Sequence, residues 1–171
     1  MSSSVSKKNS HSVFNHQPFL MKEFNTITDI LDFAIGEEEA AVDFYMMLAS
    51  HSKNDEIKKV FISYAEEEMG HKAKLIDVKE NGLQVFGAKP MTDLKIADYL
   101  VDVKARPDMS YQEALILAMK KEKAAFRLYT ALADRMEDPA MKQTFYLLAQ
   151  EESKHKLRFE VEYDDNVLKE N

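Results

Sequence analysis

AIGEEEAAVDFYMMLA, residues 34–49, decides the fold together with its repeat AMKKEKAAFRLYTALA, residues 118–133. The two segments share Ala, Glu, Ala-Ala, Tyr and Leu-Ala in register. A second pair follows at the same offset of 84 residues, with IKKVFISYAEEEMGHK at 57–72 and MKQTFYLLAQEESKHK at 141–156. Because the offset is the same for both pairs, the connecting loop is duplicated as well. The sequence therefore predicts two equivalent halves related by a pseudo-twofold axis.

The composition indicates an all-α protein. Only four Gly and four Pro occur, and Ala, Leu, Met, Glu and Lys are common, which favours long helices over short strands joined by tight turns. A chain of 171 residues with 45% hydrophobic content can bury one sizeable core. The periodicity and the helix-capping residues predict four long helices, at about residues 26–50, 55–80, 110–136 and 139–161.

The lengths of the connections predict how these helices are arranged. The short links near residues 51–54 and 137–138 make two antiparallel helical hairpins. Residues 82–109 form a long crossover between the hairpins, with a short amphipathic helix expected over 92–103. Residues 1–22 lack periodicity and are expected to form a flexible tail, so we expect the bundle domain to span 23–171.

Several classes of function are excluded by composition and charge. The net charge of -7 arises from interleaved acidic and basic residues, without the basic stripe needed to bind nucleic acid. The absence of Cys excludes disulfides, thiolate catalysis and iron–sulfur clusters. No apolar run approaches the roughly 20 residues of a membrane span, and no signal peptide is recognisable. We therefore expect a cytoplasmic protein with neither nucleic acid nor a membrane as partner.

Each predicted helix has an apolar stripe that one or two titratable residues interrupt near its middle. Residues on such a stripe face the centre of a bundle. The first and third helices contribute one Glu each, and the second and fourth contribute Glu-x-x-His, whose two residues share a helix face. The six residues are Glu38, Glu68, His71, Glu122, Glu152 and His155.

Burying four carboxylates together requires compensation. Without metal, burial and mutual repulsion are expected to raise the pKa values of the clustered carboxylates. Two divalent cations balance four carboxylates while the imidazoles stay neutral, so the pattern predicts a dinuclear metal site with six protein ligands. One Glu from each of two helices and Glu-x-x-His from each of the others is the arrangement known for di-iron and di-manganese carboxylate bundles. A metal-free adaptor bundle would leave these stripe carboxylates unexplained.

In these residues the sequence resembles the rubrerythrin branch of the ferritin-like superfamily, over about residues 26–161. The resemblance implies a ferritin-like four-helix bundle and a non-haem di-iron site that reacts with dioxygen or hydrogen peroxide. Two iron ions are the implied cofactor, with manganese as the alternative and without haem. Since this chain has no Cys for the rubredoxin module typical of rubrerythrins, reductive turnover needs a separate electron donor. Ala125 stands where the family has an extra Glu, and its repeat mate is Ala41, so a symmetric six-ligand site is expected.

Two tyrosines complete the predicted site. Tyr45 and Tyr129 lie two turns beyond Glu38 and Glu122 on the same helix faces, and are candidates to orient ligand carboxylates or to supply an electron. The alternative is an ordinary core tyrosine. The carboxylates beside the ligand positions are expected to lie at the surface or to contact the ligands from outside; they are Glu37, Glu39, Glu67 and Glu151.

Two functions remain open from the sequence. The first is a di-iron oxidoreductase with peroxidase-like or ferroxidase activity, for which we expect a homodimer. The second is iron storage or delivery, in which the same centre oxidises ferrous iron for a mineral core. Storage requires a closed cage, and no fifth helix is evident after the fourth.

Overall fold

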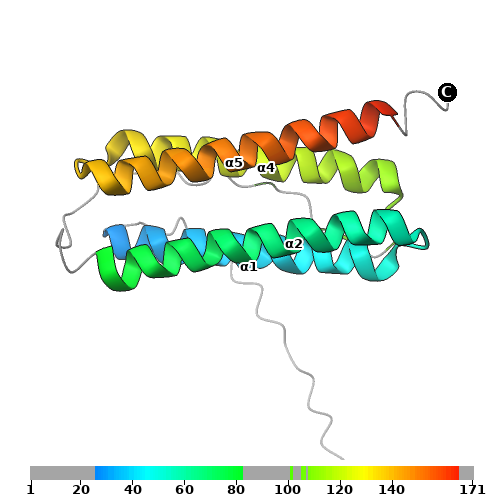
Figure 1. Ribbon diagram of the computed structural model, residues 1–171, viewed down its shortest axis with the longest axis horizontal. Helices are drawn as coiled ribbons and strands as arrows, with labels where there is room; N and C mark the ends of the chain where they lie inside the picture. Colours follow the sequence, from blue (N-terminus) through cyan, green and yellow to red (C-terminus); the bar gives the residue numbers. More distant parts are fainter. Residues whose placement is uncertain (1–25, 83–100, 102–104, 107, 166–171) are drawn as a thin grey trace, which may run out of the picture.

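The computed structural model describes residues 26–82, 101, 105–106 and 108–165 (Figure 1). Four long helices dominate this part of the chain and form a ferritin-like bundle, as predicted. Their bounds are α1 Ile27–His51, α2 Asp55–Asp77, α4 Tyr111–Arg135 and α5 Pro139–Tyr163. None of the helices that the structure describes combines the length and the apolar character needed to cross a bilayer.

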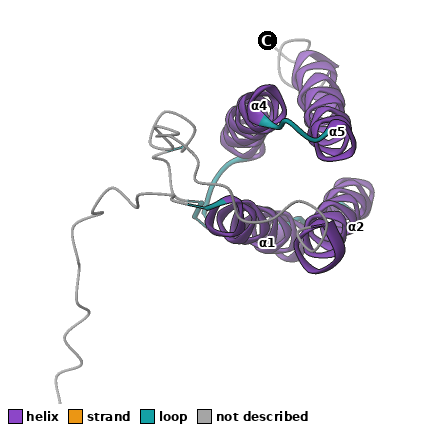
Figure 2. Cartoon of the chain, turned by 90° about the vertical axis from the view of Figure 1, so that its left-hand side faces the viewer, coloured by secondary structure: helices purple, strands orange, loops and turns teal. Residues whose placement is uncertain are grey.

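The helices are arranged as two layered hairpins. Figure 1 shows α1 and α2 running side by side in one layer and α4 and α5 in the other. Viewed end-on in Figure 2, the helices occupy four corners, with α1 beside α4 and α2 beside α5. Stripe residues from all four helices therefore meet along the bundle axis.

Capping residues determine where the helices begin, and they too follow the repeat. The four N-caps are Thr26, Asn54, Ser110 and Asp138. Thr26 and Asp29 form a reciprocal capping box, with N···O distances of 3.0 and 3.1 Å. Ser110 and Glu113 form the equivalent box for α4, at 2.8 and 3.2 Å. These bonds satisfy backbone N–H groups that the first turn leaves unpaired.

The end of the first hairpin differs from the prediction. The sequence predicts a regular helix to about Glu80, but α2 ends at Asp77 and the chain continues as a π-helical turn, Val78–Gly82. The Asn81 side chain of this turn donates a hydrogen bond to Asp77, the last residue of α2, at 2.6 Å. The predicted tail, 1–22, lies outside the described residues, and so does the short helix expected over 92–103, apart from residue 101.

The apolar core has two parts, one on each side of a polar middle layer. One cluster joins the start of α1 and α5 to the end of α2 and α4, with Ile30, Leu31, Leu132 and Phe145 fully buried. The other joins the opposite ends of the same helices, around Tyr45 and Phe159. The polar layer between them contains the candidate site.

Candidate metal centre

The six predicted ligand residues converge in the polar layer between the two apolar clusters. All six side chains are buried, with exposed fractions of only 1–4%. Each comes from the middle of its helix, as the stripe pattern predicts. The helices contribute Glu38 from α1, Glu68 and His71 from α2, Glu122 from α4, and Glu152 and His155 from α5.

These residues form two groups that share two carboxylates. In the first group, Nδ1 of His71 lies 2.8 Å from Glu152 Oε1, 2.9 Å from Glu68 Oε2 and 3.8 Å from Glu38 Oε2. Glu68 and Glu152 turn their other oxygens towards the second histidine. The geometry therefore makes these two carboxylates bridging groups, whereas Glu38 serves one group only.

The second group repeats the first around the other histidine. Nδ1 of His155 lies 3.1 Å from Glu68 Oε1, 3.7 Å from Glu122 Oε2 and 3.7 Å from Glu152 Oε2. In each group the possible ligand atoms all lie within 4.8 Å of one another. The two imidazole rings are stacked, with their centroids 5.5 Å apart.

The donor set fits two metal ions. Atoms held about 2.0–2.2 Å from one cation lie roughly 3 Å apart at right angles and roughly 4 Å apart when opposite, which matches the separations found here. Glu152 Oε1 is buried and accepts no hydrogen bond, although His71 Nδ1 is only 2.8 Å away, because the hydrogen bond of that nitrogen is made with Glu68. A buried carboxylate oxygen without a donor needs another partner, and a cation between these atoms provides one.

Without metal, the cluster distributes protons unevenly among its carboxylates. Burial raises the pKa of Glu38, and the charges of Glu152 and Glu68 raise it further. Burial and the charge of Glu68 likewise raise the pKa of Glu152. Burial also acts to raise the pKa of Glu68, but hydrogen bonds from His155 and His71 outweigh it and lower the pKa. The expectation of raised pKa values throughout the cluster is therefore wrong for Glu68, which accepts from both imidazoles.

The histidines respond to the same contacts. Burial acts to lower the pKa of His71, but its hydrogen bond with Glu68 raises it overall. For His155, contacts with Glu122 and Glu68 overcome burial and raise the pKa to about 11. Both shifts favour the protonated form of the imidazoles beside Glu68, and a metal ion competes with these protons for the ring nitrogens.

Two further carboxylates hold the histidines from outside. Glu151 Oε2 lies 2.9 Å from Nε2 of His71, and Glu67 Oε2 lies 2.9 Å from Nε2 of His155. Each reaches across from the opposite helix of the α2–α5 pair. Glu67 and Glu151 therefore contact the ligands from outside, which is one of the two positions that the sequence predicts for them.

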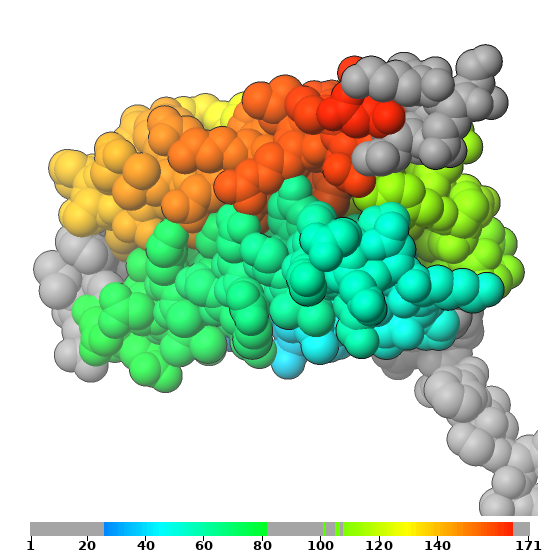
Figure 3. All heavy atoms as spheres, turned by 45° about the vertical axis from the view of Figure 1, so that its right-hand side comes forward, coloured from blue at the N-terminus to red at the C-terminus, as the bar shows by residue number. Residues whose placement is uncertain are grey.

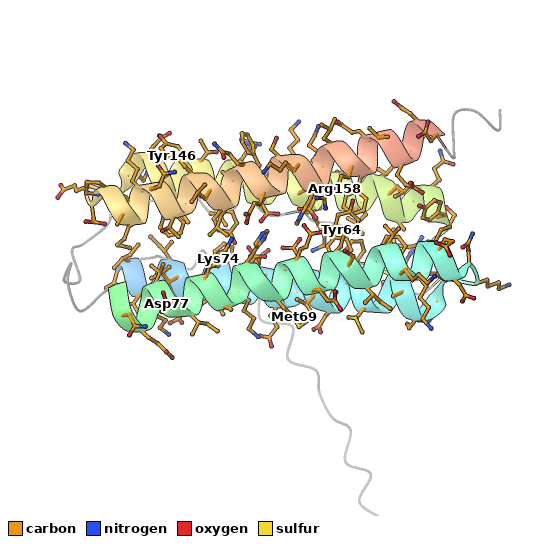
Figure 4. All side chains as sticks on the ribbon, in the orientation of Figure 1. Tyr64, Met69, Lys74, Asp77, Tyr146 and Arg158 are labelled. Carbon is orange, nitrogen blue, oxygen red and sulfur yellow. The ribbon has the colours of Figure 1, made fainter. Side chains whose placement is uncertain are left out.

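Cations anchor these outer carboxylates on the surface of the bundle. Lys74 pairs with Glu151 at 2.9 Å, and its repeat mate Arg158 pairs with Glu67 at 2.9 Å. Figure 4 labels both cations on the side where α2 faces α5. Sequence reasoning missed Lys74 and Arg158, although the 84-residue offset relates them and was available as a signal. The carboxylate Glu39 instead lies at the surface and pairs with Lys72 at 3.1 Å.

The two tyrosines are fully buried and bind the unshared carboxylates crosswise. The Tyr45 hydroxyl of α1 donates to Glu122 Oε1 of α4, and the Tyr129 hydroxyl of α4 donates to Glu38 Oε1 of α1. Each tyrosine thus contacts the carboxylate of the other half rather than the one on its own helix. These bonds place both hydroxyls where they orient carboxylates; a part in catalysis stays a prediction.

A polar groove leads from solvent to the site between α2 and α5. It encloses about 320 Å³, and Figure 3 shows the face on which these helices meet. The groove is lined by Glu67, Gly70, His71, Lys74, Glu151, Lys154, His155 and Arg158. Small molecules therefore have a polar approach to the outer edges of both imidazoles.

Comparisons with known proteins point to one family and fold. The family model for rubrerythrin matches residues 29–163. The chain is similar to a Thermotoga maritima protein described as a ferritin-like diiron-carboxylate protein, with 26% identity and a TM-score of 0.67 over 84% of this chain and 98% of that one. Its fold also resembles that of a hypothetical protein of Pyrococcus furiosus, with 24% identity and a TM-score of 0.61 over 80% and 87% of the chains. No curated protein matches the sequence.

Proposed function

Because the chain belongs to the rubrerythrin family, we propose that it is a non-haem di-iron oxidoreductase that reduces hydrogen peroxide or dioxygen. The observation that carries this proposal is the pair of shared carboxylates, Glu68 and Glu152, each with one oxygen beside either histidine. Oxygen and imidazole donors suit iron and manganese alike, and we propose iron. Two bound iron ions would supply the electrons that reduce the oxidant.

The outer carboxylates prepare the histidines to bind metal. If Nε2–H of His71 donates to Glu151, Nδ1 of His71 presents a lone pair to the cluster. Glu67 accepts from Nε2–H of His155 in the same way and leaves Nδ1 of His155 free to bind metal. The negative charge of each outer carboxylate also makes the imidazole a better donor. Glu67 and Glu151 thus set both the tautomer and the basicity of the two nitrogen ligands.

The tyrosines prepare the unshared carboxylates in a similar way. Tyr129 occupies Oε1 of Glu38, which leaves Oε2 facing His71 Nδ1. Tyr45 occupies Oε1 of Glu122 and leaves its Oε2 facing the other histidine. Each carboxylate can therefore bind with one oxygen, and a phenolic proton lies next to the reacting space, where oxidant reduction consumes protons.

A matched pair of variants tests the proposal. Glu38→Gln removes a buried candidate ligand, whereas Glu39→Gln changes an exposed neighbour. After anaerobic loading with ferrous iron, we expect the wild type and Glu39→Gln to oxidise the bound iron rapidly on addition of peroxide or oxygen. Glu38→Gln should bind less iron and oxidise it slowly. Equal behaviour of the two variants would contradict the proposal.

The size of the oligomer distinguishes the proposed oxidoreductase from an iron-storage protein. We propose a homodimer, for which size-exclusion chromatography should give a small particle before and after iron loading. A cage-sized particle that keeps accumulating ferric iron well beyond two ions per chain would instead support storage. Catalytic consumption of peroxide with a reductant present, at constant iron content, is the result expected of the oxidoreductase.

A further inference from the structure

A chain of rings connects the candidate metal centre with one end of the bundle. Starting near the surface, Tyr111 contacts Phe61 with ring centroids 6.1 Å apart, and Phe61 stacks on Tyr45 at 6.4 Å. Tyr45 contacts Tyr64 at 5.5 Å, and Tyr64 meets the ring of His155 edge-on at 5.4 Å. Every step lies within the usual range for aromatic pairs.

The other half of the bundle has no such chain among its described residues. The repeat places Ile27, Phe145, Tyr129, Leu148 and His71 at the five equivalent positions. The central pair is retained, with Tyr129 and Phe145 at 6.3 Å. Ile27 stands at the position equivalent to Tyr111, and Leu148 at the position equivalent to Tyr64. Since aliphatic residues fill the same places in one half, packing alone does not require the aromatic rings in the other.

Both ends of the chain have the contacts that a redox relay needs. At the inner end, the Tyr45 hydroxyl donates to Glu122 of the candidate site. At the outer end, the half-buried Tyr111 donates its hydroxyl hydrogen bond to Glu162. Tyr111 also lines a cavity of about 260 Å³ that includes the exposed Lys53 of the loop between α1 and α2. The chain thus runs from the polar layer to a tyrosine that is partly exposed at one end of the bundle.

We propose that Tyr111, Phe61, Tyr45 and Tyr64 conduct single electrons between the metal centre and an external one-electron carrier at the Tyr111 end of the bundle. This inference rests on the proposed function. The carrier is oxidised by one electron and the oxidised iron centre is reduced by one. When Tyr45 gives an electron inwards, its O–H bond breaks and the proton passes to the carboxylate of Glu122, and the electron from Tyr111 restores Tyr45 together with that proton. When Tyr111 gives its electron inwards, its O–H bond breaks and the proton passes to the carboxylate of Glu162. When the carrier refills Tyr111, that proton returns.

The absence of cysteine allows a direct test. One introduced cysteine can carry a ruthenium photosensitiser, either at Lys53→Cys or at Glu137→Cys. These exposed positions are equivalent in the repeat, so they lie at opposite ends of the bundle and form a matched pair. Flash oxidation of the label in the metal-free chain, followed by freeze-trapping, allows tyrosyl radicals to be detected by electron paramagnetic resonance.

We expect the label at position 53 to produce a buried radical that Tyr45→Phe removes. The label at position 137 should produce much less radical at Tyr129. Replacing Tyr111 by Ile, the residue at its repeat mate Ile27, should abolish the Tyr45 signal. Tyr111→Phe keeps the ring but lacks the hydroxyl, and should also lose the signal with an unchanged circular dichroism spectrum. Equal radical yields from the two labels, or a yield unaffected by both Tyr111 variants, would overturn the inference.

The iron-loaded protein supplies the second measurement. With the label used as a photoreductant, loss of the ferric absorbance should be faster from position 53 than from position 137, and Tyr111→Ile should remove the difference. Equal rates would overturn the proposed route. The two proposals fail separately, because radical transfer in the metal-free chain does not depend on iron. Conversely, iron binding and peroxide consumption would survive if radical transfer were absent.

Discussion

At the scale of single residues, Glu68 and Glu152 connect the two halves of the site. Each places one oxygen near His71 Nδ1 and the other near His155 Nδ1. Loss of either carboxylate leaves both groups incomplete, whereas loss of Glu38 affects one group. The orphaned oxygen of Glu152 is also the clearest sign that protein atoms alone do not complete this cluster.

The outer carboxylates provide the first prediction. Glu67→Gln and Glu151→Gln keep the size of the side chain but remove the charge that polarises His155 and His71. We expect each to weaken ferrous iron binding by about 10–100-fold, the usual effect of losing a partner of a metal-bound histidine. Competition with a colorimetric ferrous chelator measures this. The exposed Glu66 provides the control, and an equal loss in Glu66→Gln would show a general charge effect instead.

The stripe periodicity was enough to place all six candidate ligands in the buried polar layer, because a residue's face on a helix follows from its spacing. It did not indicate which carboxylates are shared. It also did not predict that Tyr45 binds Glu122 rather than Glu38. Those contacts depend on how far neighbouring helices are shifted and rotated against each other, which side-chain packing decides. Tyr64 was missed because nothing in a single helix marks a ring that will meet a histidine of another.

At the scale of helices, the start of each element was predictable and some ends were not. Thr26 and Ser110 stand at N-caps with an acidic residue three positions later, so local chemistry alone marks where α1 and α4 begin. The π-helical turn Val78–Gly82 has no comparable local signal, since the residues there suit a regular helix end equally well.

The capping boxes provide the second prediction. Thr26→Ala and Ser110→Ala each remove the side-chain acceptor for the third backbone N–H of a helix. Each should lower the free energy of unfolding of the metal-free protein by about 1 kcal/mol. Because both caps lie far from the polar layer, iron stoichiometry should not change. Chemical denaturation followed by circular dichroism measures the first effect, and a variant that also lost iron would show that the helix ends control the site.

At the scale of the whole molecule, the two halves share a backbone plan but differ chemically. The repeat predicted equivalent ligands, and the structure places these at the same offset of 84 residues. The N-caps and the outer ion pairs of Lys74 and Arg158 follow the same offset, although they were not predicted from the repeat. The halves differ in their apolar clusters, where Tyr64 and Tyr111 correspond to Leu148 and Ile27. The helical periodicity places all four of these residues on apolar stripes and so does not distinguish rings from aliphatic side chains. The difference between the two halves becomes visible only when the two repeats are aligned.

The pKa shifts of the cluster provide the third prediction, a gain of stability of the metal-free protein as the pH falls from 8 to about 5. Glu38 and Glu152 have raised pKa values, so the folded state binds their protons more tightly than the unfolded state. The contribution of these two carboxyl groups to the free energy of unfolding grows as the pH falls towards their pKa in the unfolded chain, near 4.5. His71 and His155 also have raised pKa values, and their contribution is complete below 6.5 and lost at higher pH.

Glu68 reverses this trend under more acidic conditions. Its pKa is lowered, so its contribution is present above 4.5 and disappears as the pH falls through the folded value. Metal-free protein should therefore show a stability maximum near pH 5, measurable by thermal melts in matched buffers. Iron-loaded protein should lose stability on acidification throughout, because protons compete for the ligands. Identical profiles with and without iron would contradict the clustering of these groups.

The most direct test of the central claim, a dinuclear site with shared Glu68 and Glu152, is a crystal structure of the iron-loaded protein with anomalous scattering measured at the iron edge. We expect two peaks per chain, separated by about 3.5–4 Å as in other two-metal sites. One peak should be bound by Nδ1 of His71 and the other by Nδ1 of His155, with both bridging carboxylates between them. A single peak, or iron bound only in the outer groove at Glu67 and Glu151, would contradict the account.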